Sequence, residues 1–535
     1  MKPVKPFILK YWSQIVLIFI LLLGAYLRLY MIRNYMTFLG DEGRDVLIVM
    51  HMIVNHKFTL LGPTASVGGF FLGPIYYYFM LPFLWAFKLD PVGPAVMVAL
   101  FGIATIYLVY KTGTDFFNKL AGLIAASIYA ASPLVIAYSR SSWNPNIVPF
   151  FSLCLLYYLW KLVVKPGKYD AIIIGIALGI GIQLHYLFLF LFVVVGVWYL
   201  LQIRRIHFFR TVIKTIVGFI IGFLPFLAFE VRHGFPNTKS IIQFLLAGKD
   251  TGFSWAQYFP TISDVIFRIF ARLLYRIPEE PLWNNYPHWY VLVLVILTKA
   301  TIYVPVLLFI LITGLSFKKV RTKIAKSWVS TIDRVTGHSG YSIEAIFLLL
   351  VWFFTVILLF GLYRKAIYDY YFGIVFWLPF LFLGFTLSRL WIGSVGKVMT
   401  VILWGALLFF NWQGRPFVFP PNNQLSQIQT IARVALERTD GKPFNFALIT
   451  EGNSDHAYRY FFEIWGRAPV TIEPAGADPD RKTVTNQLIV ICETMNCKPL
   501  GNSLWEVAGF GRADIVGSWD VPFVKIYKLV HYKGT

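Results

Sequence analysis

The first 410 residues alternate long apolar runs with short basic linkers. We assign eleven of these runs as membrane spans, from about Lys10–Arg33 to Val398–Phe410. The run Ile75–Phe87 is short and contains Pro82, so we expect it to be interfacial or re-entrant. Every strongly basic linker then lies on one side, with Lys318–Arg334 the most basic. The pattern predicts a polytopic α-helical membrane protein with a cytoplasmic N-terminus.

From about Asn411 the hydrophobic and polar positions follow a different pattern, which resembles a soluble domain. Helical periodicity and apolar runs of strand length alternate there. The predicted helices are Gln424–Arg438 and Ser454–Gly466, and the predicted strands are Phe444–Thr450, Gln487–Cys492 and Phe523–Leu529. We therefore divide the chain into a membrane domain, 1–410, with external loops at 34–74 and 230–286, and a small extracytoplasmic α/β domain, 411–535.

Composition agrees with a membrane protein. Hydrophobic residues make up 58% of the chain and charged residues 14%, whereas soluble proteins are about one quarter charged. The net charge of +22 is explained by the basic linkers, so no nucleic acid partner is expected. The first span has no cleavage site and should remain attached. Short loops and the lack of a visible retention signal favour a prokaryotic plasma membrane.

The three cysteines allow two arrangements. Cys154 lies inside a predicted span, while Cys492 and Cys497 belong to the C-terminal domain. The latter two could form a disulfide if that domain lies outside the cell, or could remain free thiols.

An acidic cluster follows the first span. Asp41, Glu42 and Asp45 fall within five residues, together with Arg44, although the whole chain has only 26 acidic residues. Ionisable groups beside a bilayer are costly and usually mark a substrate site or a proton relay. A structural alternative is that Asp41 is the N-cap of a helix Glu42–His56, whose dipole favours the other carboxylates. A catalytic aspartate could also be such a cap.

Further polar residues are predicted at the outer ends of later spans. They are Arg140, Asn144, His185, Arg232, His233, Arg364, Tyr368 and Asp369. Outward arginines are exceptions to the positive-inside rule, and arginine binds phosphate oxygens in a bidentate manner. Each arginine alone could be a headgroup anchor. Together, beside an acidic loop, they favour a substrate that carries a phosphate.

A divalent metal is one option for a cofactor, and no cofactor is assigned from the sequence. His185 and His233 could approach the acidic loop, while His51 and His56 are five residues apart and share a helix face poorly. Histidines in such places are more often hydrogen-bonded structural residues. The metal ligands therefore stay unassigned.

The order of these features resembles the GT-C glycosyltransferases over about residues 10–390. The resemblance is strongest to the branch of protein O-mannosyltransferases and bacterial aminoarabinose transferases, the dolichyl-phosphate-mannose-protein mannosyltransferase-like group. Its most specific part is Gly40-Asp41-Glu42, and the stretches Ser139–Pro145 and Tyr368–Phe372 also look like family positions. The C-terminal domain lies outside the resemblance.

The resemblance implies transfer of a sugar from a polyprenyl-phosphate carrier to an acceptor on the outer face, with inversion. Asp41 would be the general base and Glu42 would orient the acceptor, which could be a protein, a lipid or a glycan. The other charged and polar residues named above, including Arg44 and Asp45, would bind phosphate or sugar. The lipid tail of the carrier would lie between spans.

Three other functions remain open. A transporter or flippase of a lipid-linked sugar would fit a polytopic chain, but the spans contain almost no Asp or Glu and no inverted repeat is visible. A membrane scaffold without catalytic activity would tolerate replacement of Asp41. An oligosaccharide transferase is disfavoured because Asn144 and Asn146 stand where a further carboxylate would help to bind a metal.

Overall fold

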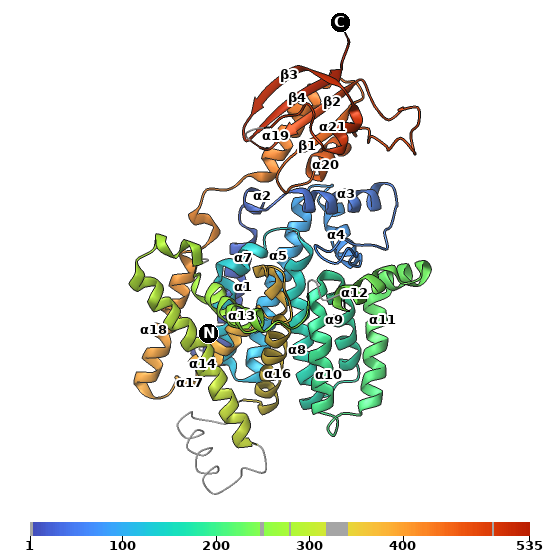
Figure 1. Ribbon diagram of the computed structural model, residues 1–535. Coiled ribbons are helices and arrows are strands. Elements are labelled where there is room, and N and C mark those ends of the chain that lie inside the picture. The colour runs from blue at the N-terminus through green and yellow to red at the C-terminus, as the bar shows by residue number, and fades with distance from the viewer. Residues whose placement is uncertain (1–3, 247–250, 278–279, 317–340, 495–496, 535) are drawn as a thin grey trace.

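The protein consists of a helical body with a small α/β domain at one end (Figure 1). The computed structural model describes residues 4–246, 251–277, 280–316, 341–494 and 497–534. The predicted basic linker Lys318–Arg334 lies outside the described residues.

The first half of the body contains helices of very different length. They are α1 Val4–Leu29, α2 Ile32–Tyr35, α3 Gly40–Val54, α4 Ile75–Ala86, α5 Val92–Phe116, α6 Lys119–Ala131, α7 Pro133–Tyr138, η1 Asn144–Ile147, α8 Val148–Val164, α9 Asp170–Leu184, η2 Tyr186–Phe188, α10 Leu189–Leu201 and α11 Phe208–His233.

The second half completes the body and leads to the C-terminal domain. Its helices are α12 Pro236–Leu246, α13 Trp255–Tyr275, η3 Glu280–Asn285, α14 His288–Ser316, α16 Ile343–Phe360, η5 Asp369–Ile374, α17 Leu378–Arg389, α18 Gly393–Trp412 and η6 Pro416–Val418.

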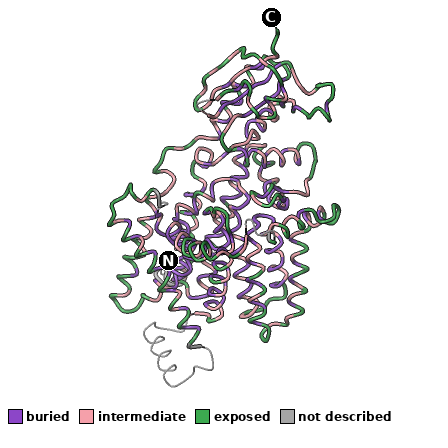
Figure 2. The backbone as a smooth tube through the Cα atoms, viewed as in Figure 1, coloured by how far each residue is buried: buried purple, intermediate pink, exposed green. Residues whose placement is uncertain are grey.

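The predicted spans coincide with apolar helices. Seven described helices are long and apolar enough to cross a membrane, and five more are apolar but shorter. Each of the eleven predicted spans corresponds to one of these twelve helices. The remaining helix is α4, which corresponds to Ile75–Phe87, the run that was predicted to be interfacial or re-entrant. Many residues of α11, α14 and α18, on the flanks of the body, are exposed (Figure 2), and many of those are large apolar residues. The prediction of a multi-pass α-helical membrane protein is confirmed.

Small residues allow α9 and α11 to pack closely. Gly175 and Gly179 of α9 face Gly218 and Gly222 of α11, and a Cβ at any of the four would meet backbone atoms of the other helix. Helix pairs in membranes associate largely through such small-residue contacts. The two GxxxG patterns therefore let the helices approach closely, and the Gln183 amide of α9 also donates to Gly222 O of α11 at 2.7 Å.

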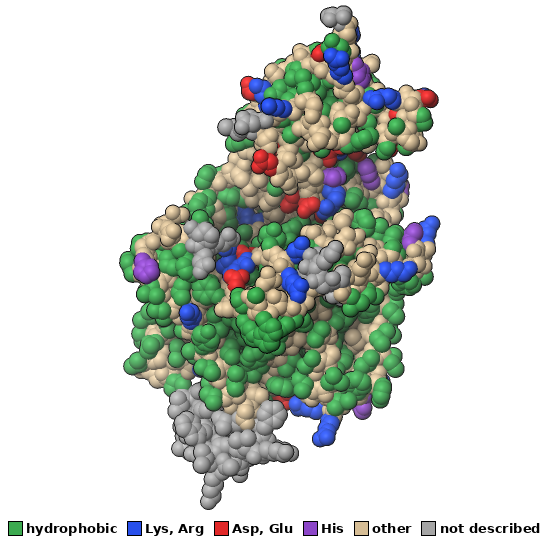
Figure 3. All heavy atoms as spheres, in the orientation of Figure 1, with side chains coloured by type: hydrophobic (Ala, Val, Ile, Leu, Met, Phe, Trp, Pro, Cys, Tyr) green, Lys and Arg blue, Asp and Glu red, His purple; other side chains and the backbone are tan. Residues whose placement is uncertain are grey.

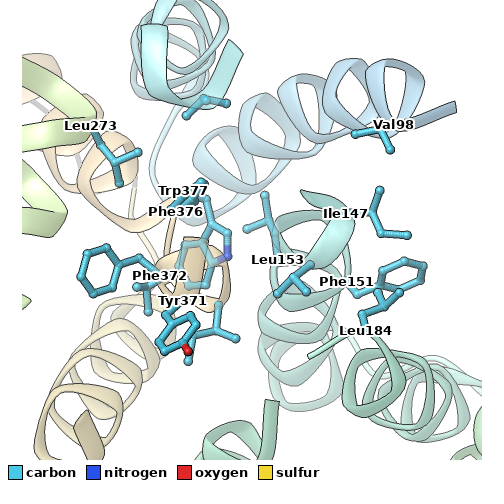
Figure 4. Packing of buried hydrophobic residues seen from close by; sticks show 14 of the residues in the cluster. Val98, Ile147, Phe151, Leu153, Leu184, Leu273, Tyr371, Phe372, Phe376 and Trp377 are labelled. Carbon is cyan, nitrogen blue, oxygen red and sulfur yellow. The ribbon is translucent and has the colours of Figure 1, made fainter. Parts of the chain in front are cut away.

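The interior of the body is built around η5 and the start of α17. Figure 4 shows Phe372, Phe376 and Trp377 among apolar side chains of neighbouring helices. The Trp377 indole Nε1 donates to Ser152 Oγ on α8 at 3.0 Å, and that hydroxyl also contacts Gly373 O at 3.2 Å. This core holds the irregular segment before α17 in place.

The segment 230–286, which the sequence analysis treated as a loop, is largely helical. It contains α12, α13 and η3. Helix α13 is amphipathic, with Val265, Ile269 and Leu273 buried against the body. The helices within this linker were not predicted, because α13 is too polar on one face to qualify as a span, although its helical periodicity is clear.

The C-terminal domain has a four-stranded sheet with the order β1-β2-β4-β3. Strands β1 and β2 are parallel, whereas β4 is antiparallel to β2 and β3. Its elements are α19 Gln424–Glu437, β1 Asn445–Ile449, α20 His456–Ile464, β2 Gln487–Cys492, α21 Trp505–Phe510, β3 Ala513–Val521 and β4 Val524–His531. The predicted α/β domain is confirmed, and Cys492 and Cys497 form a disulfide.

Sequence reasoning missed α21 and β3. Helix α21 has only six residues, which is too short for a clear periodicity. Strand β3 lies at the edge of the sheet, with mostly exposed or half-buried residues and a register irregularity at Ile515/Gly517. Neither element therefore has the apolar run by which the other strands were recognised.

The domain rests directly on α3. A Cβ at Gly43 would meet the backbone of Ala457 in α20, so only glycine permits this approach. The His51 imidazole Nε2 lies 2.7 Å from Glu463 Oε2 of α20. The Tyr460 hydroxyl donates to Leu89 O between α4 and α5. The C-terminal domain is therefore joined to the body by polar and apolar contacts.

Candidate active site

Helix α3 begins with the Gly40-Asp41-Glu42 motif. Its N-cap is Leu39, so the alternative that Asp41 is the N-cap was wrong. The carboxylate Oε2 of Glu42 accepts the backbone N–H of the N-cap residue Leu39 at 3.0 Å, which is one of the two hydrogen bonds of a capping box. Asp41 lies in the first turn with a largely exposed side chain. The helix dipole stabilises a carboxylate at this position.

Arg44 joins the other two carboxylates of the cluster. Its Nη1 lies 2.9 Å from Asp41 Oδ1, and its Nη2 lies 2.8 Å from Asp45 Oδ1. Asp45 is fully buried, and its Oδ1 also accepts the Tyr77 hydroxyl at 3.0 Å. Burial raises the pKa of Asp45 to about 6, against the opposing effect of Arg44 and Tyr77. Arg44 therefore connects an exposed carboxylate to a buried one.

Glu42 is the other buried carboxylate of the acidic cluster Asp41, Glu42 and Asp45. Burial raises its pKa to about 7, although the hydrogen bond from Leu39 lowers it. A carboxyl group with this pKa changes its protonation state in the neutral range, which is common at catalytic sites.

The start of α3 lines a cavity of about 1120 Å³ beneath the C-terminal domain. Figure 3 shows charged side chains gathered in the hollow between this domain and the body, above a mostly hydrophobic flank. The helical body contributes Asp41, Glu42, Tyr138, Ser141 and Trp143 among others, and the C-terminal domain contributes Thr450–Ser454, Glu493 and Thr494. We call this space the acidic cavity, because four of its lining residues are carboxylates, namely Asp41, Glu42, Glu451 and Glu493.

A second cavity, of about 1210 Å³, adjoins the first at Tyr138, which lines both. It is bounded by α13, α14, α16 and the segment before η5. Its charged lining residues are three cations, Arg268, Arg272 and Lys299, and two carboxylates, Asp264 and Asp369. Apolar side chains of α14 and α16 form another part of the wall, including Val295, Ile302, Val306 and Phe353. We call this space the cationic cavity.

The predicted residues Tyr368 and Asp369 line the cationic cavity. Asp369 is buried, and its Oδ1 lies 2.8 Å from Arg268 Nη2 while its Oδ2 lies 2.5 Å from Arg272 Nε. Tyr368 is exposed and stacks on Tyr370 with ring centroids 5.8 Å apart. Asp369 thus orients two arginines that line the same cavity.

Three predicted residues are buried in the walls near these cavities. The Arg140 guanidinium donates to the carbonyls of Leu27 and Tyr30, each at 2.8 Å. The amide of Asn144 donates to Leu184 O at 2.6 Å. The His185 ring stacks on Tyr186 with centroids 4.6 Å apart, and its Nδ1 accepts the Leu187 N–H at 3.2 Å. These side chains connect the segments that carry the predicted polar motifs.

The other predicted residues lie apart from the lining of either cavity. Arg232 is exposed at the end of α11, and His233 Nδ1 is 2.9 Å from Phe229 O of the same helix. Arg364 Nη2 donates to Phe253 O at 2.7 Å. Among the described residues no group of three or more His, Cys, Asp and Glu side chains could hold a metal ion. The divalent ion considered from the sequence therefore has no assigned ligands.

Sequence reasoning missed the basic residues of the cationic cavity. Lys299 lies in the middle of the apolar helix α14, and a charge inside a span is a strong functional signal. Arg268 and Arg272 are four residues apart, so they lie on one face of α13. Both signals were present in the sequence, but the first was overlooked inside a predicted span and the second inside a predicted loop.

The two cavities have complementary chemistry. The acidic cavity offers carboxylates that can accept a proton, and the cationic cavity offers guanidinium and ammonium groups beside an apolar wall. The second combination suits an amphiphile with an anionic headgroup.

Comparison with known families agrees with the resemblance seen in the sequence. Residues 73–229 match the family model described as dolichyl-phosphate-mannose-protein mannosyltransferase. The resemblance to this glycosyltransferase family is thus confirmed over that part of the chain. The matched segment begins after α3, so it does not include Asp41 and Glu42. No curated protein sequence matches the chain.

Solved structures provide more distant likenesses. ArnT from Cupriavidus metallidurans bound to undecaprenyl phosphate is 13% identical, with 97% of this chain and 98% of that chain covered and a TM-score of 0.48. Archaeal oligosaccharyltransferase AglB from Archaeoglobus fulgidus, in complex with an inhibitory peptide and a dolichol-phosphate, is 14% identical over 90% and 70% of the chains, with a TM-score of 0.45. Arabinofuranosyltransferase AftD from Mycobacteria is 12% identical over 98% and 40%, with a TM-score of 0.44.

Proposed function

We propose that this protein is a glycosyltransferase that moves a sugar from a polyprenyl-phosphate donor to an acceptor on the outer face of a prokaryotic plasma membrane. The donor binds in the cationic cavity and the acceptor in the acidic cavity. The observation that carries the proposal is that the two cavities adjoin at Tyr138, so a reacting sugar can lie between them.

The cationic cavity fits the donor in two respects. Arg268, Arg272 and Lys299 supply positive charge for the phosphate, with Asp369 holding the two guanidinium groups in position. Apolar residues of α14 and α16 supply a surface for the first isoprene units.

Asp41 is the general base in this scheme. Its carboxylate accepts the proton of an acceptor hydroxyl while the acceptor oxygen attacks the anomeric carbon of the sugar. The bond from that carbon to the phosphate oxygen breaks, and polyprenyl phosphate leaves with the electron pair. A single displacement inverts the anomeric configuration. Arg44 fixes Asp41 through Oδ1 at 2.9 Å, and Glu42 orients the acceptor from the wall of the same cavity.

The basic residues of the cationic cavity stabilise the departing phosphate, since negative charge develops there as the sugar leaves. The buried Arg140, Asn144 and His185 hold the loops that form the walls. Protein, lipid and glycan acceptors all offer the required nucleophile. No step of this scheme requires a metal ion.

The test is transfer of radiolabelled sugar from a panel of polyprenyl-phosphate sugars by the purified full chain in detergent. Wild type should turn over with at least one donor, and Asp41→Asn should lose nearly all turnover, a fall of about 100-fold or more. Asp480→Asn, an exposed replacement in the C-terminal domain, should behave as wild type. Transport of a lipid-linked sugar across vesicles, without transfer to any acceptor, would instead establish the flippase alternative.

A further inference from the structure

A polar side chain of the C-terminal domain, Asn453, hydrogen-bonds to the start of α3. The loop Thr450–Ser454 follows β1, and Glu493 follows β2, so both come from the ends of two paired parallel strands. Together they form the wall of the acidic cavity opposite Asp41. The scheme above gives these residues no role.

Asn453 caps α3 from a distance of 413 residues along the chain. Its Oδ1 accepts the Gly40 backbone N–H at 2.8 Å and the Ser454 N–H at 2.9 Å. The first turn of a helix has N–H groups without partners in the helix, and the N-cap Leu39 has no side-chain acceptor. The carboxamide of Asn453 therefore supplies a hydrogen bond that the local sequence cannot.

Glu493 holds Asn453 in this orientation. The Asn453 amide Nδ2 lies 3.2 Å from each Glu493 carboxylate oxygen. The same carboxylate accepts the hydroxyls of Thr450 and Tyr458, each at 2.8 Å. Its backbone N–H donates to Ile449 O at 2.9 Å. Because Glu493 is fixed on several sides, Asn453 has little freedom to rotate.

The fit also excludes a side chain at the contact. A Cβ at Gly40 would lie 2.7 Å from the Ser454 backbone nitrogen and closer still to its hydroxyl. Glycine at position 40 is therefore what allows the domain to reach the helix start. Asp41 is the next residue, so the position of its carboxylate depends on this contact.

From these contacts we infer that Asn453, supported by Glu493, is a positioning residue that fixes Asp41 for catalysis. The inference rests on the proposed function, because it assumes that Asp41 is the base. The acidic side of the site is then built jointly by the two domains, whereas the cationic cavity is built by the helical body. This gives the C-terminal domain a part in the reaction.

The first test is Asn453→Ala in the full chain. A base displaced by about 1 Å can cost on the order of 100-fold in rate, so kcat should fall at least tenfold. The KM for the donor should stay within about twofold, because no donor-binding residue changes. Ser503→Ala, at an exposed serine of the same domain, should keep the wild-type kcat. An Asn453→Ala protein with wild-type kcat would overturn the inference.

An exchange of the two partners separates positioning from general damage. Asn453→Asp alone places two carboxylates about 3.2 Å apart, and kcat should fall. Adding Glu493→Gln lets the new amide at position 493 donate to the new carboxylate at position 453, and the pair again contains one carboxylate. The double variant should recover most of the lost kcat. A double variant with a kcat as low as that of Asn453→Asp alone would contradict the inference. This exchange experiment remains decisive even if Asn453→Ala does not fold.

Hydrogen exchange supplies a readout that does not require turnover. In Asn453→Ala the amides at the start of α3 should exchange at least tenfold faster than in wild type, while amides in α14 should not change. Unchanged exchange at Gly40 would overturn the inference on its own. If wild type transfers no sugar from any donor, the proposed function fails, and the exchange result still decides whether Asn453 holds the helix.

Discussion

Replacing Glu42 with glutamine should stabilise the protein at alkaline pH. The Glu42 side chain is buried, and burial raises its pKa from an ordinary 4.5 to about 7. Glu42→Gln removes the charge but keeps an oxygen that can accept the Leu39 N–H. The change therefore isolates the cost of ionising a buried carboxyl group.

The magnitude follows from the difference between the two pKa values. Because the folded chain has the higher pKa, it binds the Glu42 proton more tightly than the unfolded chain does. The Glu42 contribution to stability is thus fully present below about pH 4.5, falls as the pH rises, and is lost above about pH 7. The loss amounts to about 3 kcal/mol. Glu42→Gln does not have this loss, so its advantage should grow from near zero at pH 4.5 to about 3 kcal/mol at pH 8.

Thermal unfolding of the purified full chain in detergent, from pH 4.5 to pH 9, measures this effect. Glu42→Gln should unfold several degrees higher than wild type at pH 8 and at nearly the same temperature at pH 4.5. Glu437→Gln, at an exposed glutamate of α19, should follow wild type throughout. A Glu42→Gln protein with the wild-type pH dependence, or one less stable at pH 8, would refute the reasoning.

Three further predictions concern other parts of the molecule. Arg272→Gln should raise the donor KM about 10-fold or more while leaving the thermal stability of the C-terminal domain unchanged, as measured by initial rates and calorimetry. Gly43→Ala should destabilise the folded chain by about 1–3 kcal/mol, because the new Cβ would meet the backbone of α20. Gly405→Ala is the control, because a Cβ there has open space, and thermal unfolding should show a lower melting temperature for Gly43→Ala alone. Alkylation of the unfolded, unreduced chain should modify one thiol, Cys154, and reduction of the Cys492–Cys497 disulfide should expose two more.

Spans were predictable because bilayer thickness imposes a length on them. An apolar run as long as His288–Leu315 is typical of a membrane-spanning helix, and it coincides with α14. Strand β2 was predicted with its observed bounds, Gln487–Cys492, because a central strand buried on both faces is a continuous apolar run. The length of α14 is set by the bilayer that surrounds it, and the apolar run of β2 is set by its burial on both faces.

The composition of the site was predictable only in part. The acidic cluster stands out in an apolar chain, so Asp41 and Glu42 were found. The contact between Gly40 and Asn453 depends on how two domains meet, and no local pattern records it. The N-cap alternative failed for a similar reason, since Leu39 has no side-chain acceptor and the N–H groups of Leu39 and Gly40 are paired instead with Glu42 and Asn453. Arg268 and Arg272 were missed because a polar helix face was taken for a loop.

The central claim is that donor binding and proton abstraction belong to different cavities. Direct binding of a labelled polyprenyl-phosphate sugar by the Asp41→Asn full chain, measured beside its turnover, tests that claim. We predict a donor Kd within about threefold of wild type together with a loss of turnover of about 100-fold or more. Loss of donor binding in step with turnover, or turnover at the wild-type rate, would contradict the account.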